Sequence, residues 1–274
     1  KVARFCNVER DAVIEAMDAS TIYEVPLLMQ KEGLDKVVLR KLGLTDNTEV
    51  KLEQWCNFLE RIQNPKQKIT IGLVGKYVEL QDSYKSILEA FIHAGAENEV
   101  KVKVESIHSE YLTVDNASEK LKHLHGVLVA PGFGERGIEG KIDAIRYVRE
   151  NNIPFLGICL GMQMAVIEYA RNVLNLSDAN SIEMDDSTKN PVIAIMEDQK
   201  NITQMGGTMR LGSWECKLKD GSKIHEIYNS QTIHERHRHR YEYNNKYKEQ
   251  LEAAGLISTG INPDTGLVET IELK

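Results

Sequence analysis

The sequence predicts an α/β fold in which helices cover a doubly wound, mostly parallel sheet. From residue 69 onward, short apolar runs alternate with segments whose apolar residues recur at helical spacing. Such alternation is typical of parallel sheets built from strand–helix–strand units. One predicted strand also runs straight into a helix through a cysteine between two glycines, which is how several α/β enzymes present a nucleophile.

The first 68 residues are expected to form a separate part of the chain. Residues 2–7 are predicted as a short strand and 10–42 as mainly helical, while 52–62 reads as an amphipathic helix. The polar stretch from Asn64 to Lys68 contains a proline and predicts a linker. We therefore divide the chain into 1–44, a linker with a helix at 45–68, and a main domain at 69–274.

Strands and helices are expected to alternate strictly along the first half of the main domain. Strands are predicted at 69–74, 100–107, 126–130 and 154–158, and helices at 84–94, 117–124, 138–151 and 160–170. Five later strands are predicted at 192–196, 208–218, 236–243, 255–261 and 266–273.

The composition and charge of the chain argue against some classes of binding partner. The 274 residues are 42% hydrophobic and 27% charged, a mixture typical of globular proteins with a sizeable core. The formal net charge of −7 argues against nucleic acid, because duplex-binding proteins carry a basic excess. No apolar run approaches the roughly 20 residues of a membrane span. The start of the chain, without an initiator methionine, is interpreted as a cut into a longer protein.

The four cysteines, Cys6, Cys56, Cys159 and Cys216, are far apart and form no Cys-x-x-Cys pair. This spacing argues against a zinc site or a secreted disulfide framework and favours a reducing, cytoplasmic location. Three of them, Cys6, Cys56 and Cys216, are interpreted as small buried apolar side chains.

Cys159 stands at the predicted junction of a strand and a helix, with Gly157 and Gly161 two residues to either side. This is a cysteine version of the G-x-S-x-G nucleophile elbow, whose tight turn leaves no room for neighbouring side chains. The unpaired N–H groups and positive dipole end of the helix are expected to favour a thiolate. Cys159 is thus the predicted nucleophile, and a structural cysteine in a glycine-rich turn is the alternative.

An oxyanion formed at Cys159 needs hydrogen-bond donors. The N–H of Leu160 is one candidate, and Gly132, in the loop after the 126–130 strand, leaves a second N–H open. The same loop spells G-x-G-x-x-G, so a dinucleotide site is an alternative. However, the acidic residue that this signature requires about 20 residues further on is missing, which disfavours that reading.

The stretch 235–241 is rich in arginine and histidine. Strand alternation puts its three arginines on one face and its two histidines on the other. We interpret one arginine as a bidentate ligand of a substrate carboxylate. A solvated edge strand and a metal site on the two histidines are the alternatives, and no metal is predicted.

Four motifs together resemble the CTP synthase family: 72–77, 157–163, 206–212 and 235–241. The 157–163 motif is similar to class I glutaminases in general, and the last two are specific to CTP synthases. The resemblance covers essentially the whole chain. It implies that 1–44 is the end of the ligase domain and that the residues from 69 form a glutaminase domain of the flavodoxin-like type.

The resemblance implies that glutamine is hydrolysed through a γ-glutamyl thioester on Cys159, with Gly132 and Leu160 stabilising the oxyanion. The released ammonia would serve the ATP-dependent amination of UTP to CTP. ATP and Mg would bind mainly outside this chain, GTP would activate the glutaminase step, and the full enzyme would be a homotetramer. Glu183 suits the α-ammonium of glutamine and Arg240 its α-carboxylate. The implied glutamine-binding set is Gly132, Leu160, Gly161, Met162, Gln163, Glu183 and Arg240, and Lys1 and Asp18 match nucleotide-contacting positions.

The family's catalytic histidine and glutamate would lie in an F-H-P-E motif after the 266–273 strand. None of the eight histidines lies in such a motif, so that segment is cut off, disordered or lost. A polypeptide ending at Lys274 is therefore expected to be a poor glutaminase. His237 and His239 are the nearest substitutes and are expected on the wrong face of their strand.

Two other functions stay open at this stage. A chain that has lost the base would be a non-catalytic or assembly module of the same fold. A cysteine hydrolase acting on other γ-glutamyl compounds would keep the nucleophile, although Glu183 and the arginine cluster favour free glutamine.

Overall fold

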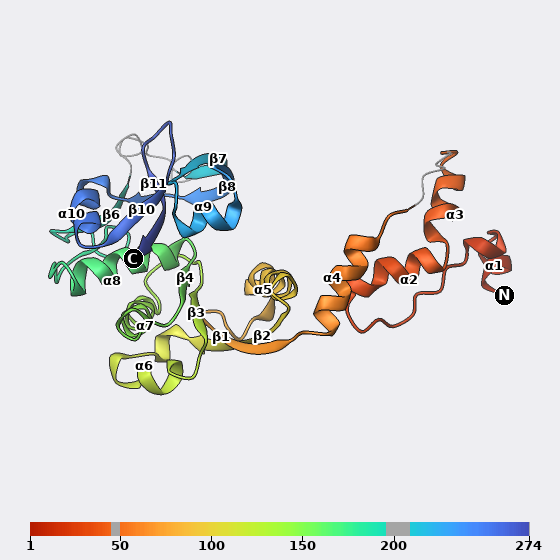
Figure 1. Cartoon of the computed structure of the whole chain (residues 1–274), viewed down its shortest axis with the longest axis horizontal. Helices are drawn as coiled ribbons and strands as arrows, with labels where there is room; N and C mark the ends of the chain where they lie inside the picture. Colours follow the sequence, from red (N-terminus) through yellow and green to blue (C-terminus); the bar gives the residue numbers. More distant parts are fainter. Residues whose placement is uncertain (45–49, 196–208, 274) are drawn as a thin grey trace. The chain divides into compact units, whose positions relative to one another are not determined.

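The computed structural model describes residues 1–44, 50–195 and 209–273 (Figure 1). The glycines and threonine at 206–208 of the 206–212 motif, and residue 196 of the predicted 192–196 strand, lie outside the described residues. The helices are α1 (Val2–Phe5), α2 (Val25–Lys31), α3 (Leu34–Lys41), α4 (Glu53–Gln63), α5 (Lys85–Glu97), α6 (Val114–Leu121), α7 (Ile138–Glu150), α8 (Leu160–Asn172), α9 (Lys223–Tyr228) and α10 (Lys248–Ala253). The strands are β1 (Gln67–Gly75), β2 (Val100–His108), β3 (Gly126–Val129), β4 (Phe155–Gly157), β5 (Asn180–Ser181), β6 (Pro191–Ile195), β7 (Arg210–Leu218), β8 (Thr232–His239), β9 (Tyr241–Tyr243), β10 (Leu256–Ile261) and β11 (Val268–Leu273).

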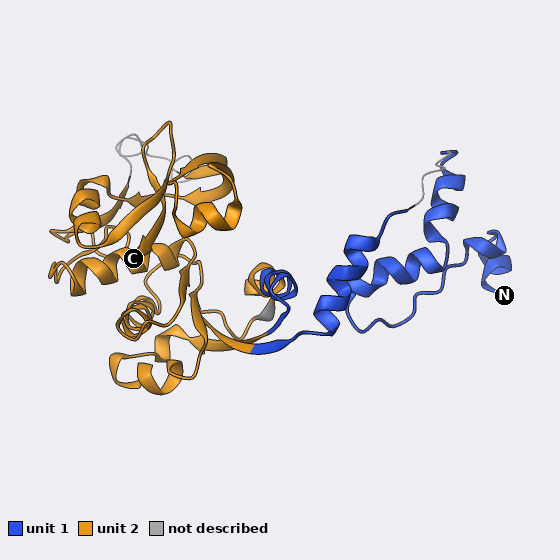
Figure 2. Cartoon of the chain, viewed as in Figure 1, with its two compact units in different colours: residues 1–68, 90–101 blue, residues 69–89, 102–274 orange. Residues whose placement is uncertain are grey.

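The chain divides into two compact units (Figure 2). Residues 1–68 and 90–101 form the first, and residues 69–89 and 102–274 form the second. The strand predicted at 2–7 is wrong, because this segment forms the short helix α1. Its backbone N–H groups are satisfied locally, with Phe5 and Cys6 donating to the carbonyls of Lys1 and Val2.

An aromatic cluster holds the first unit together. The ring of Tyr23 lies 6.0 Å from Trp55, 5.2 Å from Phe58 and 5.4 Å from His93, measured between centroids. The indole N–H of Trp55 donates to the Tyr23 carbonyl at 2.8 Å, so the cluster is bonded as well as packed.

The second unit is built around a four-stranded sheet in the order β2-β1-β3-β4. β3 pairs in parallel with both β1 and β4. All four residues of β3 are buried, which explains why the strand reads as a continuous apolar run. The predicted α/β fold with a parallel sheet is confirmed.

α7 and α8 pack against each other beside this sheet. α8 is buried on nearly all sides from Met164 to Ala170, so its sequence is apolar in consecutive positions rather than on one stripe. Glu168 in this helix is only 1% exposed and forms an ion pair with Arg149 of α7 at 2.8 Å. The core around them includes Val74, Val129, Ile142, Ile145, Met164, Ile167 and Ile193.

The strands from β5 onward form two further sheets, and the sequence did not predict that most of these strands pair antiparallel. β11-β10-β7-β8 is antiparallel throughout, and β9 joins β5-β6 antiparallel to β6. The strand predicted at 236–243 is split, because β8 ends at His239 and β9 begins at Tyr241 in the other sheet. Arg240 therefore lies at a bend between two sheets.

Three neighbouring parallel strands end at one edge of the first sheet. Lys76 follows β1, Ala130 follows β3, and Ile158 and Cys159 follow β4. Ligand sites in α/β folds lie at the carboxyl ends of the strands, so this edge is where a site is expected.

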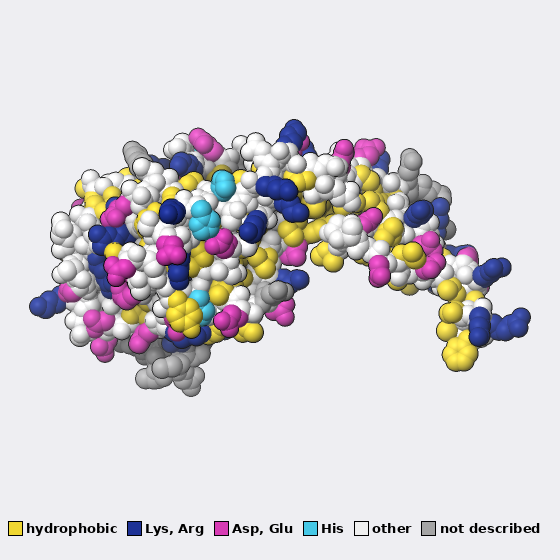
Figure 3. Space-filling view, turned by 90° about the horizontal axis from the view of Figure 1, so that it is seen from below, with side chains coloured by type: hydrophobic (Ala, Val, Ile, Leu, Met, Phe, Trp, Pro, Cys, Tyr) yellow, Lys and Arg dark blue, Asp and Glu magenta, His cyan; other side chains and the backbone are white. Residues whose placement is uncertain are grey.

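The hydropathy of the described helices and the charges on one face of the surface (Figure 3) reflect the composition of the sequence. No described helix is both long enough and apolar enough to cross a bilayer. On the face shown in Figure 3, acidic and basic side chains are interspersed. This agrees with the modest negative net charge of −7.

Candidate active site

Cys159 lies on a strained turn between β4 and α8. Its backbone angles are φ 57° and ψ −108°, a region that residues other than glycine rarely adopt and that costs about 1–3 kcal/mol. A Cβ at Gly157 would come within 2.6 Å of the Gly161 backbone, and one at Gly161 within 2.3 Å of the Val129 carbonyl oxygen. The turn therefore requires both glycines, as the elbow motif predicts.

Two backbone N–H groups point at the Cys159 sulfur. They belong to Leu160 and Gly132, and each lowers the pKa of the thiol. Burial is the larger cause and raises that pKa above its ordinary value. The N–H of Leu160 at the helix N-terminus thus favours the thiolate as expected, but burial acts more strongly and the net shift of the thiol pKa is upward.

An imidazole contacts this thiol. His239 Nε2 lies 3.2 Å from Cys159 Sγ, so the expectation that the two histidines face away from the nucleophile is wrong. Alternation along β8 does hold, with His237 and His239 half-buried and the arginines between and before them exposed. The pattern identified the two faces correctly, but it could not say which face meets Cys159.

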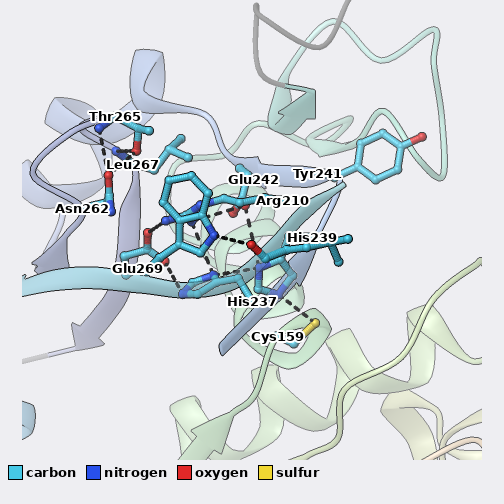
Figure 4. A network of polar contacts seen from close by, with 12 residues as sticks. Cys159, Arg210, His237, His239, Tyr241, Glu242, Asn262, Thr265, Leu267 and Glu269 are labelled. Atoms are coloured by element: carbon cyan, nitrogen blue, oxygen red, sulfur yellow. Dashed lines mark hydrogen bonds and ion pairs between the residues drawn. The ribbon is translucent and has the colours of Figure 1, made fainter. Parts of the chain in front are cut away.

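A chain of polar contacts leads away from the thiol (Figure 4). His239 Nδ1 lies 3.1 Å from His237 Nδ1, and His237 Nε2 lies 3.2 Å from a carboxylate oxygen of Glu269. Arg210 forms a 2.6 Å ion pair with Glu269 and a 3.6 Å contact with Glu242. β7, β8, β9 and β11 thus contribute to one buried network beside the nucleophile.

Three groups of this network are of the kind that binds metals. Ligand atoms of His237, His239 and Glu242 lie within 4.8 Å of one another. However, the Arg210 guanidinium is 3.4 Å from His237 Nδ1 and 3.6 Å from Glu242 Oε1. A permanent cation at this distance repels a divalent ion and already neutralises the carboxylate, so the donor set does not fit a metal.

Burial lowers the pKa of both histidines to about 4, with Arg210 as a second cause at His237 and His237 itself at His239. In an unfolded chain the pKa of histidine is about 6.5, so unfolding at mildly acidic pH takes up protons. Stability that is fully present above pH 6.5 is therefore lost as the pH falls toward 4.

We expect His237→Gln to reduce this acid sensitivity. Between pH 7 and pH 5 the wild type should lose on the order of 2 kcal/mol more unfolding free energy than the variant, measured by urea denaturation. His123→Gln, at a surface histidine paired with Glu105, is the control and should keep the wild-type pH dependence. Equal acid sensitivity of His237→Gln and wild type would contradict the prediction.

A pocket of about 210 Å³ opens beside the sulfur. Gln163 donates its side-chain N–H to the Tyr241 carbonyl at 2.8 Å, and Glu183 accepts from the Gly134 N–H at 3.1 Å, so both side chains are held in place. The lining residues are Gly132, Phe133, Cys159, Gln163, Glu183, Met209, His239, Arg240 and Tyr241.

Several site residues predicted from the sequence do not line this pocket. Gly161 packs against Val129, and the Met162 side chain packs against the hydrophobic core. Leu160 is 2% exposed and contributes its N–H group. Lys1 and Asp18 are exposed and belong to the first unit.

Four lining residues were not among the predicted site residues, although His239 was considered as a substitute base. Phe133 follows the predicted Gly132, while His239 and Tyr241 flank the predicted Arg240. Arg240 and His239 both reach the pocket because β8 ends between them and alternation stops there. Met209 gave no signal beyond its place in the 206–212 motif.

The other cysteines differ from their predicted burial. Cys6 and Cys56 are exposed, so the interpretation of these two as buried side chains is wrong. Cys216 is buried as predicted, and burial raises its pKa to about 12. A general alkylating reagent will therefore reach Cys6 and Cys56, and only a reagent that fits the pocket can single out Cys159.

Comparison with known proteins identifies two family regions. The sequence model of the family "Glutamine amidotransferase class-I" matches residues 79–274, and that of "CTP synthase N-terminus" matches residues 1–44. CTP synthases of Christiangramia forsetii and Flavobacterium johnsoniae are 68% and 65% identical over all 274 residues. The chain spans about half of the length of these relatives, 50% and 51%.

A solved structure shares the fold. It is described as the Trypanosoma brucei CTPS glutaminase domain with bound acivicin, and it superposes with a TM-score of 0.68 at 38% identity. The match covers 75% of this chain and 79% of the solved one. The chain therefore belongs to the class I glutamine amidotransferase family and, within it, to the CTP synthases.

Proposed function

We propose that the site hydrolyses glutamine through a thioester on Cys159. The observation that carries this proposal is the elbow, which holds the thiol in a pocket with the N–H groups of Leu160 and Gly132 directed at the sulfur. Glu183 and Arg240 supply charges of opposite sign on the pocket wall. A zwitterionic amino acid with an amide at its far end suits this combination.

The reaction follows from these positions. The Cys159 sulfur attacks the γ-amide carbon, and the carbonyl oxygen becomes an oxyanion that accepts from Gly132 and Leu160. The C–N bond then breaks, ammonia leaves with one added proton, and a γ-glutamyl thioester remains. Water attacks the thioester, which releases glutamate and returns the thiol.

The thiol proton must be transferred when the sulfur attacks. His239 Nε2, at 3.2 Å, is the imidazole within reach of that proton among the described residues. With its pKa lowered to about 4 by burial, it is a weak proton acceptor at neutral pH. A further histidine and glutamate supplied by the F-H-P-E motif, as the resemblance implies, stays a prediction.

We further propose that the ammonia serves the ATP-dependent amination of UTP to CTP in the complete protein, as the family implies. ATP with Mg would bind mainly outside this chain, GTP would activate the glutaminase, and the complete enzyme would be a cytoplasmic homotetramer. Residues 1–44 would complete the ligase domain, 45–68 would link, and 69–274 would carry the glutaminase. Lys1 and Asp18, which are both exposed, would contact the nucleotide in that domain.

The proposal is tested by incubating the protein, expressed from its complete reading frame, with glutamine and measuring glutamate and ammonia. Turnover of glutamine with ATP and UTP giving CTP is the expected result. Hydrolysis of other γ-glutamyl compounds but not of glutamine would favour a different cysteine hydrolase. No turnover of either, with Cys159 intact, would favour a non-catalytic module.

We expect Arg240→Ala to raise the KM for glutamine by about 10- to 100-fold, because a charge-assisted hydrogen bond is worth about 1.5–3 kcal/mol. Formation of CTP from free ammonia should be unchanged, since ammonia does not need the pocket. Arg238→Ala is the matched control, as this neighbouring arginine is exposed and does not line the pocket. If ammonia-dependent synthesis falls in parallel with glutamine use, Arg240 has a structural role instead.

A further inference from the structure

Two lysine side chains lie under the loop that carries Gly132. Lys141 of α7 is completely buried, and its Nζ donates to the Ala130 carbonyl at 3.0 Å. Lys76, at the end of β1, is 9% exposed and donates to the Phe133 carbonyl. A Cβ built on Gly132 would lie 3.8 Å from Lys141 Nζ and 3.8 Å from Lys76 Cε, so both side chains reach the underside of this residue.

Burial of the Lys141 ammonium costs folding free energy. A buried ammonium loses its hydration, and no carboxylate among the described residues acts on it to offset that loss. Burial lowers its pKa to about 8, with the nearby charge of Lys76 as the next cause. A methionine of similar length would fill the same space without this penalty, so stability alone does not explain a lysine here.

The loop has little else to hold it. Residues 130–133 belong to no helix or strand, and Pro131 has no N–H to donate. Ala130 is tied at its N–H to the Val74 carbonyl, and its own carbonyl, two residues before Gly132, accepts from Lys141. The Phe133 carbonyl, one residue after Gly132, accepts from Lys76. The two lysines therefore restrain the loop on both sides of the Gly132 N–H.

We propose that Lys141, assisted by Lys76, is a positioning residue that holds the 130–133 loop so that the Gly132 N–H faces the reacting oxygen. The inference rests on the proposed glutaminase function and extends it to residues outside the pocket lining. An oxyanion-hole donor stabilises the transition state only when it is oriented before the reaction. The charge of Lys141 also favours the thiolate, because it lowers the pKa of the Cys159 thiol.

The competing explanation is that Lys141 merely anchors α7 to the sheet. The two explanations differ in what Lys141→Met does to stability. A structural anchor would lose stability and activity together. A positioning residue kept at a stability cost would lose activity while the melting temperature stays the same or rises.

The experiment compares wild type, Lys141→Met, Lys76→Met and Glu168→Gln in the full-length protein. Glu168 is the matched control, because it is a buried charged residue that bonds Arg149 of α7 and does not line the pocket. For glutamine hydrolysis, Lys141→Met should lower kcat by about 10- to 100-fold with KM nearly unchanged. Lys76→Met should change kcat in the same direction. Glu168→Gln should lower the melting temperature and leave kcat unchanged.

A second measurement does not depend on turnover. Cys159 is alkylated with iodoacetamide at pH 7 and its labelling rate is followed by peptide mapping, with exposed Cys56 as the internal reference. Slower labelling of Cys159 in Lys141→Met, with unchanged labelling of Cys56, supports the proposal even if glutamine is not the substrate. An unchanged kcat and labelling rate, or a kcat that falls only together with the melting temperature as in Glu168→Gln, overturns it.

Discussion

Replacing Cys159 with serine is expected to reduce glutamine hydrolysis by at least about 10⁴-fold, measured as glutamate released. A serine hydroxyl loses its proton far less readily than a thiol, and the adjacent His239 is too weak a base to compensate, with a pKa of about 4. The backbone donors of Leu160 and Gly132 remain, so the variant should still bind glutamine. Synthesis of CTP from free ammonia should persist at the wild-type rate.

Cys216→Ser is the matched control for this change. Cys216 is buried, with a pKa raised to about 12, and does not line the pocket. Its replacement should leave the turnover of glutamine intact. An electrophilic analogue of glutamine should modify Cys159 alone, and glutamine should protect against it. Retention of turnover in Cys159→Ser, or modification of Cys6 or Cys56 at the same rate, would remove Cys159 from the mechanism.

The nucleophile and its turn were predictable from the sequence because they are local. The apolar run before Cys159, the helix after it and the two glycines lie within a few residues, and the tight contact at Gly157 is with Gly161 in the same turn. The parallel sheet was predictable for the same reason, since each strand–helix unit carries its own periodicity.

The surroundings of the thiol could not be predicted because they depend on non-local pairing. β8 pairs with β7 and ends one residue before Arg240, and only the assembled sheets show that His239 faces Cys159. Lys141 was missed for a different reason. Lysine is almost never fully buried, so within the predicted 138–151 helix it reads as a solvent-facing residue.

The outcome for the cysteines illustrates the same limit. Cys56 lies on α4 among apolar residues at helical spacing, yet it is exposed. Helical periodicity predicts which face of a helix is apolar, but it does not predict which residues at the border of that face are buried. The pKa of the Cys159 thiol depends more on burial than on the helix N-terminus. Desolvation of the thiolate acts more strongly on this pKa than the partial charges of two N–H groups.

Gly161→Ala is expected to destabilise the protein by more than about 2 kcal/mol and to slow glutamine hydrolysis about 100-fold. The new Cβ would lie 2.3 Å from the Val129 carbonyl oxygen, which is backbone of the central strand β3 and cannot rotate away. The first turn of α8 must then shift, and it carries the Leu160 N–H that faces the sulfur. Urea denaturation and steady-state kinetics measure the two effects.

Gly126→Ala separates this effect from a general intolerance of alanine next to the sheet. Gly126 begins the same strand β3, but its new Cβ would meet the flexible Ile71 Cδ1 at 3.1 Å as its nearest neighbour. That methyl group can rotate, so we expect a smaller loss of stability and an unchanged kcat. If both alanines cost the same stability, or if Gly161→Ala keeps the wild-type kcat, the close approach of α8 to β3 does not position the elbow. The strain at Cys159 would then be maintained by contacts outside this turn.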